Sequence, residues 1–105
     1  MKAISAEQYK VRQTEAQFQR TVTDYAEKQG WLCVHFPAML ANPSGWPDLI
    51  LIRGRRTIFA ELKREGGKLG PKQEETIGSL RHVGAEAYVW FPSDWPAIEA
   101  ALRGE

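Results

Sequence analysis

The chain has 105 residues, a formal net charge of +1 and an apolar fraction of 43%. This length suits one domain rather than two, and the composition is ordinary for a globular protein. The single cysteine, Cys33, excludes an internal disulfide and a thiolate zinc site. No apolar run is long enough for a membrane span or a signal peptide, so we expect a cytoplasmic protein without membrane contacts.

The N-terminal region predicts a polar arm and then a helix. Residues 1–13 are mostly polar, and residues 14–105 are expected to form a single domain. Thr14 to Gln17 matches a capping box, and Gly30 suits the left-handed residue that ends a helix. Between them, apolar or aromatic residues recur at helical spacing: Phe18, Val22, Tyr25 and Ala26.

Three strand-like segments follow the helix. Residues 31–36 are strand-like, and residues 37–46 hold the proline, asparagine and glycine of a loop. Two β-rich runs, residues 48–53 and 56–63, flank a turn that begins with Gly54, as in a two-residue hairpin. Both faces of this hairpin are largely apolar, which predicts a place in the middle of a sheet with helices on each side.

The last third of the chain predicts a helix, a strand and a short helix. Residues 66–70 form a glycine-rich connection, and Pro71 suits the first position of a helix that ends at Gly84. Residues 86–91 are strand-like, and Ser93 or Asp94 caps a final helix. The expected order is α-β-β-β-α-β-α in an α/β domain.

The glycine-first turn sets the register of the hairpin. If Arg53 faces Arg56, the pairs further out place Asp48 opposite Glu61, with Cβ atoms about 5 Å apart. Strand alternation puts Lys63 on the same face as Glu61. A loop one residue longer or shorter would turn Asp48 to the other face.

Two carboxylates at this distance repel each other unless one is protonated or a cation lies between them. Lys63 would neutralise part of the charge or orient a water at a bound metal ion. In the simpler interpretation, Asp48 only ends a turn and Glu61 pairs with Lys63 at the surface. The placement of all three on one face of a central hairpin favours the metal site.

These residues resemble the PD-(D/E)XK nuclease superfamily. Pro47-Asp48 matches the PD element, and Glu61-Leu62-Lys63 matches the E-X-K element. The Gly67-Lys68-Leu69 segment and Gln73 make the chain similar to the VRR-NUC family, which has small stand-alone members in phages and bacteria. The resemblance spans most of the chain, from residue 15 to about residue 92, and implies a restriction-endonuclease-like core with a central mixed sheet.

The resemblance implies a Mg²⁺ or Mn²⁺ site. Asp48 and Glu61 resemble the carboxylate ligands, and the backbone carbonyl of Leu62 resembles a further oxygen ligand, which suits these ions. Lys63 resembles the residue that positions the attacking water and offsets charge in the transition state.

Two further residues resemble residues that support such a metal site. Glu15 resembles a helical acid that contacts metal, often through water, and its spacing to Phe18 and Val22 predicts that it faces inward. It also suits the helix macrodipole alone. Gln73 resembles a glutamine that supports the site, although it also suits a plain polar position in a first helical turn.

The resemblance implies a DNA endonuclease specific for branched or Holliday-junction-like DNA. Because so short a chain offers little binding surface, we also expect a homodimer that grips both strands. The alternatives are a nucleic-acid-binding module without catalysis, or a nuclease for other DNA or RNA forms. The middle of the chain is basic, which favours a polyanionic substrate but also fits a mixed solvated surface. The candidate nucleic-acid contacts are Arg55, Arg56, Arg64, Lys68 and Lys72.

Overall fold

The computed structural model describes residues 13–35 and 45–104. Its elements are α2 (Glu15–Lys28), β1 (Leu32–His35), β2 (Leu49–Arg53), β3 (Arg56–Leu62), α3 (Pro71–His82), β4 (Glu86–Trp90), the 3₁₀ helix η3 (Pro92–Asp94) and α4 (Trp95–Arg103). This order confirms the predicted fold class. Most of the predicted arm and loop, residues 1–12 and 36–44, lies outside the described residues. No helix in the described ranges is both long and apolar enough to cross a membrane.

The four strands form one mixed sheet in the order β1-β2-β3-β4. The first three are antiparallel, and β4 runs parallel to β3 after the α3 crossover. Gly54 has a φ of +61°, the left-handed conformation that the glycine-first turn requires. The ladder runs from Arg53 opposite Arg56 to Leu49 opposite Ala60, so the predicted register is confirmed.

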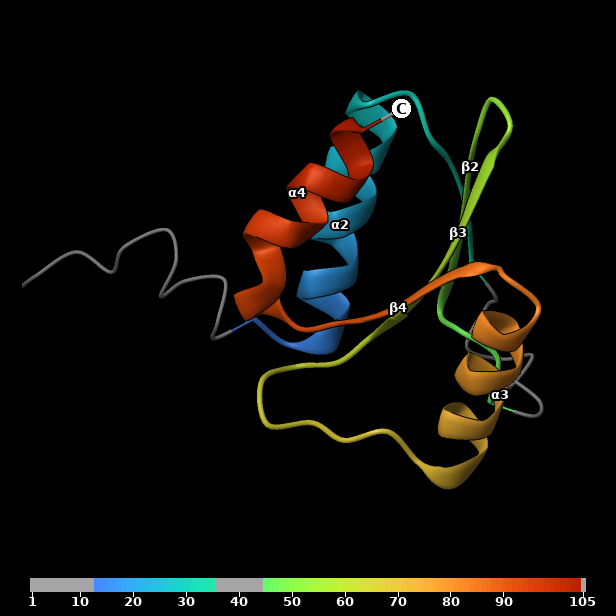
Figure 1. Cartoon of the computed structure of the whole chain (residues 1–105). Coiled ribbons are helices and arrows are strands. Elements are labelled where there is room, and N and C mark those ends of the chain that lie inside the picture. Colours follow the sequence, from blue (N-terminus) through green and yellow to red (C-terminus); the bar gives the residue numbers. More distant parts are fainter. Residues whose placement is uncertain (1–12, 36–44, 105) are drawn as a thin grey trace, which may run out of the picture.

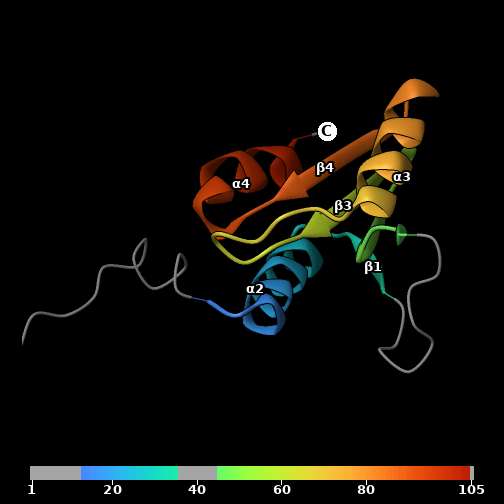
Figure 2. The ribbon, with the colours of Figure 1, turned by 90° about the horizontal axis from the view of Figure 1, so that it is seen from below.

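The sheet lies between two layers of helices (Figures 1 and 2). Helices α2 and α4 pack side by side on one face, and α3 packs on the other. The core lies mainly under α2 and α4 and includes Phe18, Val22, Leu49, Leu51, Ile58, Leu62, Ile98 and Leu102. Helix α3 covers its face of the sheet less completely: Ile52, at the hairpin end of this face, is 39% exposed.

Helix α2 begins as predicted, but its first acid is exposed. The Gln17 N–H donates to Thr14 Oγ1, and the Thr14 N–H donates to Gln17 Oε1, which completes the capping box. The buried stripe starts only at Phe18, one turn into the helix. Glu15 precedes this stripe and is exposed, so the core does not cover it, contrary to what its spacing to Phe18 and Val22 predicted.

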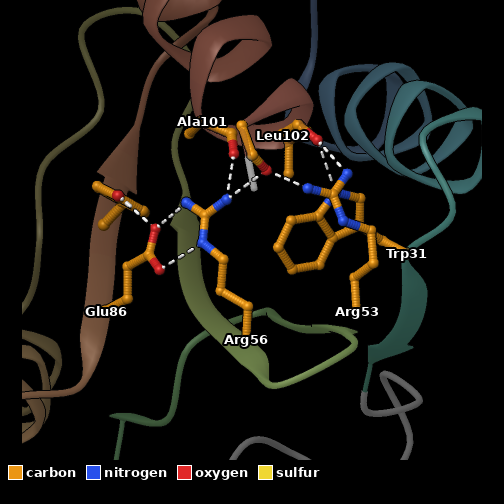
Figure 3. A network of polar contacts seen from close by, with 8 residues as sticks. Trp31, Arg53, Arg56, Glu86, Ala101 and Leu102 are labelled. Carbon is orange, nitrogen blue, oxygen red and sulfur yellow. Dashed lines mark hydrogen bonds and ion pairs between the residues drawn. The ribbon is translucent and has the colours of Figure 1, made fainter.

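Two arginines join the hairpin end of the sheet to the ends of the helices (Figure 3). Arg53 donates to the carbonyls of Gln29, Leu102 and Gly104. Arg56 donates to the carbonyls of Ala101 and Gly104, and forms a bidentate pair with Glu86 at 2.9 and 2.5 Å. Both guanidinium groups lie over the Trp31 ring, at 4.5 and 5.4 Å from its centroid. Cations at helix C-termini also complement the helix dipole.

Arg56→Met should lower the free energy of unfolding by about 1–3 kcal/mol, because it removes charged hydrogen bonds from a half-buried network. Arg55→Met is the matched control: Arg55 is the exposed neighbour at the turn, and its loss should change stability by less than about 0.5 kcal/mol. Urea denaturation of both variants measures the difference. Equal stabilities would show that the network in Figure 3 contributes nothing.

Candidate active site

Asp48 and Glu61 meet where the β2–β3 pair ends. They are the next facing residues beyond Leu49 and Ala60. The Asp48 N–H donates to Glu61 Oε1 at 3.2 Å, and the Leu62 N–H donates to Asp48 Oδ2 at 2.8 Å. The backbone of each strand therefore holds a carboxylate from the other strand, and the two carboxylates lie together as the register predicts.

Glu61 is almost completely buried, at 1% exposure, and has two further side chains beside it. Gln73 Nε2 donates to Glu61 Oε2 at 2.6 Å, and Lys63 Nζ lies 4.0 Å from the same oxygen. The Gly70 N–H donates to Gln73 Oε1 at 2.8 Å, which fixes the orientation of the amide. Because the Lys63 side chain is only 14% exposed, this is not a surface ion pair.

The environment of Glu61 disfavours its charged form. The pKa of Glu61 is raised from 4.5 to about 8. Burial is the largest cause, the hydrogen bond and negative charge of Asp48 add to it, and Lys63 acts in the opposite direction. A single lysine therefore does not compensate two carboxylates in this position. The site lacks positive charge, which a bound cation would supply.

The Leu62 carbonyl lies on the side of β3 that faces Asp48. In an antiparallel ladder the N–H and C=O of one residue point to the same side of the strand. The Leu62 N–H points to Asp48, whereas the next N–H, that of Lys63, points to the Trp90 carbonyl on β4. The C=O of Leu62 consequently also faces the side on which Asp48 lies, where the resemblance places a metal ligand.

These groups fit a hard divalent cation. Asp48, Glu61 and the Leu62 carbonyl offer three oxygen donors, which is the chemistry that Mg²⁺ and Mn²⁺ prefer, with water and phosphate completing the coordination. The raised pKa of Glu61 supports the same fit, because the deprotonated carboxylate lacks the positive charge that a bound cation would supply. Within residues 13–35 and 45–104, no three acid, histidine or cysteine side chains gather into a metal-binding group. The structure therefore does not bring Glu15 to the carboxylate pair, and its role stays a prediction.

The five predicted nucleic-acid contacts are distributed over two regions. Arg64 follows Lys63 directly, Lys72 precedes Gln73, and Lys68 lies in the connection between them. All three are exposed. Arg55 is exposed at the hairpin turn, the opposite end of β2 and β3 from the carboxylates. Arg56 is the least available of the five, because its guanidinium already binds Glu86 and the α4 carbonyls.

Sequence reasoning missed Gly45, three residues before Asp48. Gly45 contacts the start of α3 and has a φ of +70°. Trp46 lines a groove of about 520 Å³ beside the site, together with Lys72 and the exposed side of α3. The glycine just before the Pro-Asp pair was the one available sign of a close backbone contact. Its partner, Lys72, lies 27 positions further along the chain, so sequence spacing cannot identify the contact.

Comparisons with known proteins place this geometry in a known fold. No family model matches the sequence, and no curated protein matches it. A solved structure named VRR_NUC domain shares 26% identity and a TM-score of 0.69, covering 85% of this chain and 94% of its own. A second, named VRR_NUC domain protein, shares 24% identity and a TM-score of 0.66, covering 87% and 86%.

A third similar structure is a Holliday junction resolvase from Archaeoglobus fulgidus, an archaeal hyperthermophile. It shares 26% identity and a TM-score of 0.55, covering 70% of this chain and 63% of its own. The structural neighbours agree with the resemblance carried by Asp48, Glu61, Lys63 and Gln73. The chain therefore has the PD-(D/E)XK nuclease fold of the VRR-NUC type.

Proposed function

We propose that the protein is a metal-dependent DNA endonuclease that hydrolyses phosphodiester bonds with Mg²⁺ or Mn²⁺. The observation that carries the proposal is the placement of Asp48, Glu61 and Lys63 close together at the end of the central hairpin, around the buried Glu61 carboxyl group. Its structural neighbours, VRR_NUC domains and a Holliday junction resolvase, support the same reaction class.

In this proposal each residue has a separate task. Asp48, Glu61 and the Leu62 carbonyl hold the ion, which when bound polarises the phosphate and lowers the pKa of water. The Lys63 ammonium donates hydrogen bonds to the attacking water and to the phosphate oxygens, and so offsets the charge that develops there. Gln73 holds Glu61 Oε2 in place through its fixed amide.

Branched DNA is the substrate class we favour, because one of the structural neighbours is a Holliday junction resolvase. Arg64, Lys68 and Lys72 are exposed on segments next to the carboxylates and would bind the phosphate backbone. Arg55 would contact a more distant part of the DNA, and a cytoplasmic location suits such a substrate.

We further propose a homodimer, since two-fold pairing would present two such sites to the opposed strands of a junction. In support, the α3 face of the sheet exposes apolar side chains on β1 and β2: Leu32 at 62%, Val34 at 38% and Ile52 at 39%.

The proposal is tested with purified protein on a panel of labelled substrates. Linear duplex, flapped duplex, four-way junction, single-stranded DNA and RNA are each incubated with Mn²⁺, with Mg²⁺ and with chelator. We expect the protein to cut the four-way junction when Mn²⁺ or Mg²⁺ is present and not to cut it when chelator is added. Binding without cutting on every substrate would instead identify a non-catalytic module, and cutting confined to RNA or single strands would overturn the choice of substrate.

Lys63→Met separates the role of the lysine from that of the metal ligands. The variant should lose metal-dependent cutting by about 10²–10³-fold, because the ammonium acts on water and phosphate. It should bind Mn²⁺ at least as well as the wild type, because a positive charge 4.0 Å from Glu61 Oε2 is removed. Lys28→Met, at an exposed position in the last turn of α2, is the control. Cleavage rates measure the loss of activity, and calorimetric titration measures the affinity for Mn²⁺. Unchanged cutting by Lys63→Met would contradict the role of Lys63 in catalysis.

A further inference from the structure

Gly45 lies three residues before Asp48, and its backbone touches the start of α3. A Cβ atom at this position would lie 2.6 Å from the Lys72 carbonyl carbon, 2.7 Å from the Gln73 nitrogen and 2.7 Å from the Lys72 oxygen. All three are backbone atoms, which cannot rotate away as a side chain can. The φ of +70° also disfavours any residue with a Cβ. This close approach requires glycine.

The contact closes a ring of interactions around Glu61. Along one route, the chain from Gly45 leads through Pro47 to Asp48, whose N–H donates to Glu61. Along the other route, Gly45 touches Gln73 at its backbone, and the Gln73 side chain donates to the other oxygen of Glu61. The contact between the Gly45 backbone and the backbone of Lys72 and Gln73 thus sets the distance between the Asp48 segment and α3.

The geometry leaves little room for α3 to move. Restoring an ordinary contact of about 3.4 Å to a Cβ atom at position 45 would displace the helix start or the Asp48 segment by about 0.8 Å. The Gln73–Glu61 hydrogen bond is 2.6 Å long, and a shift of that size brings it close to the limit for such bonds. A substitution at position 45 would therefore weaken the hydrogen bond that holds Glu61, although residue 45 does not contact Glu61 itself.

We propose that Gly45 is a positioning residue for the metal site. Its bare backbone lets α3 approach closely enough for Gln73 to hold Glu61 in the orientation that binds the ion. The effect on the ion rests on the proposed function, whereas the effect on the Gln73–Glu61 bond does not.

The first test compares Gly45→Ala with Gly66→Ala. Gly66 has a φ of +82°, yet a Cβ there would meet nothing within 4 Å, so both variants carry the backbone strain and only one carries the collision. Mn²⁺ binding is measured by calorimetry without DNA, at a temperature where each variant is folded. Gly45→Ala should weaken binding about 10–100-fold, as loss of a ligand's supporting partner does, and Gly66→Ala by less than about twofold. Equal affinities would overturn the proposal.

A double-mutant cycle with Gln73→Ala tests the route. If Gly45 acts through Gln73, Gly45→Ala should weaken Mn²⁺ binding much less in the Gln73→Ala background than in the wild type. Independent, multiplicative losses would show that Gly45 acts elsewhere. If Gly45→Ala does not fold, Gly45→Asn takes its place, since asparagine tolerates positive φ but still carries the colliding Cβ.

A metal-free measurement keeps this inference separate from the proposed function. The NMR signals of the Gln73 side-chain amide, recorded with chelator, should move toward those of a solvent-exposed glutamine in Gly45→Ala and stay in place in Gly66→Ala. Unmoved signals in Gly45→Ala would overturn the inference. If the wild type did not bind Mn²⁺, the proposed function would be overturned. The NMR comparison would then test the role of Gly45 by itself.

Discussion

Asp48→Asn should reduce metal-dependent DNA cleavage by a factor on the order of 10³ or more, because it removes one of the two charged ligands for the ion. The substitution keeps the size of the side chain and an oxygen that can accept the Leu62 N–H. The fold should therefore persist, with a change in the free energy of unfolding of less than about 1 kcal/mol. Cleavage rates on the four-way junction, with urea denaturation alongside, measure the two effects.

Glu74→Gln is the matched control for Asp48→Asn. It removes one negative charge from an exposed position on α3, next to Gln73 in sequence but in the outer part of the helix. Its cleavage rate should stay within about twofold of the wild type, because water and salt screen the charge of an exposed side chain. If Asp48→Asn cut as fast as this control, Asp48 would not be a metal ligand.

The stability of the metal-free protein should fall as the pH rises from about 4.5 to about 8. The pKa of Glu61 is about 8 in the folded protein, against an ordinary value of 4.5, because the group is buried beside Asp48. The folded state therefore binds the Glu61 proton more tightly than the unfolded state does. The resulting stabilisation is complete below pH 4.5 and is lost as the pH rises through 8, by roughly 1.4 kcal/mol per pH unit in that window.

Urea denaturation in chelator at a series of pH values measures this loss. Glu61→Gln cannot ionise, so its stability should change much less over the same range, whereas Glu74→Gln should follow the wild type. Adding Mn²⁺ at pH 8 should restore stability to the wild type and not to Glu61→Gln, because the ion binds the folded, deprotonated carboxylate. Parallel pH profiles for the wild type and Glu61→Gln would show that burial of Glu61 does not govern its ionisation.

Much of the fold could be predicted because its signals are local. Thr14 and Gln17 mark the start of α2 within one turn, and the glycine-first turn at Gly54 sets the register of the central hairpin. Strand pairing then fixes the position of Asp48 relative to Glu61, because every facing pair follows from that turn. The carboxylate pair was therefore accessible from the sequence.

The contacts that could not be predicted join distant segments. The Arg56–Glu86 pair spans 30 positions, so a basic residue near the hairpin turn looked available for nucleic acid. Glu15 has the spacing of the buried stripe, but spacing does not show where the core ends along a helix. Gly45 depends on the packing of α3 against the chain, which no local pattern encodes.

The most direct test of the account is the position of Mn²⁺ in crystals of the wild-type protein grown at about pH 8, located by its anomalous scattering. We predict one strong peak within about 2–2.5 Å of carboxylate oxygens of both Asp48 and Glu61 and of the Leu62 carbonyl. Crystals of Asp48→Asn treated identically should lack it. Protein crystals saturated with Mn²⁺ that show no peak at these residues would contradict the metal site, and with it the proposed nuclease.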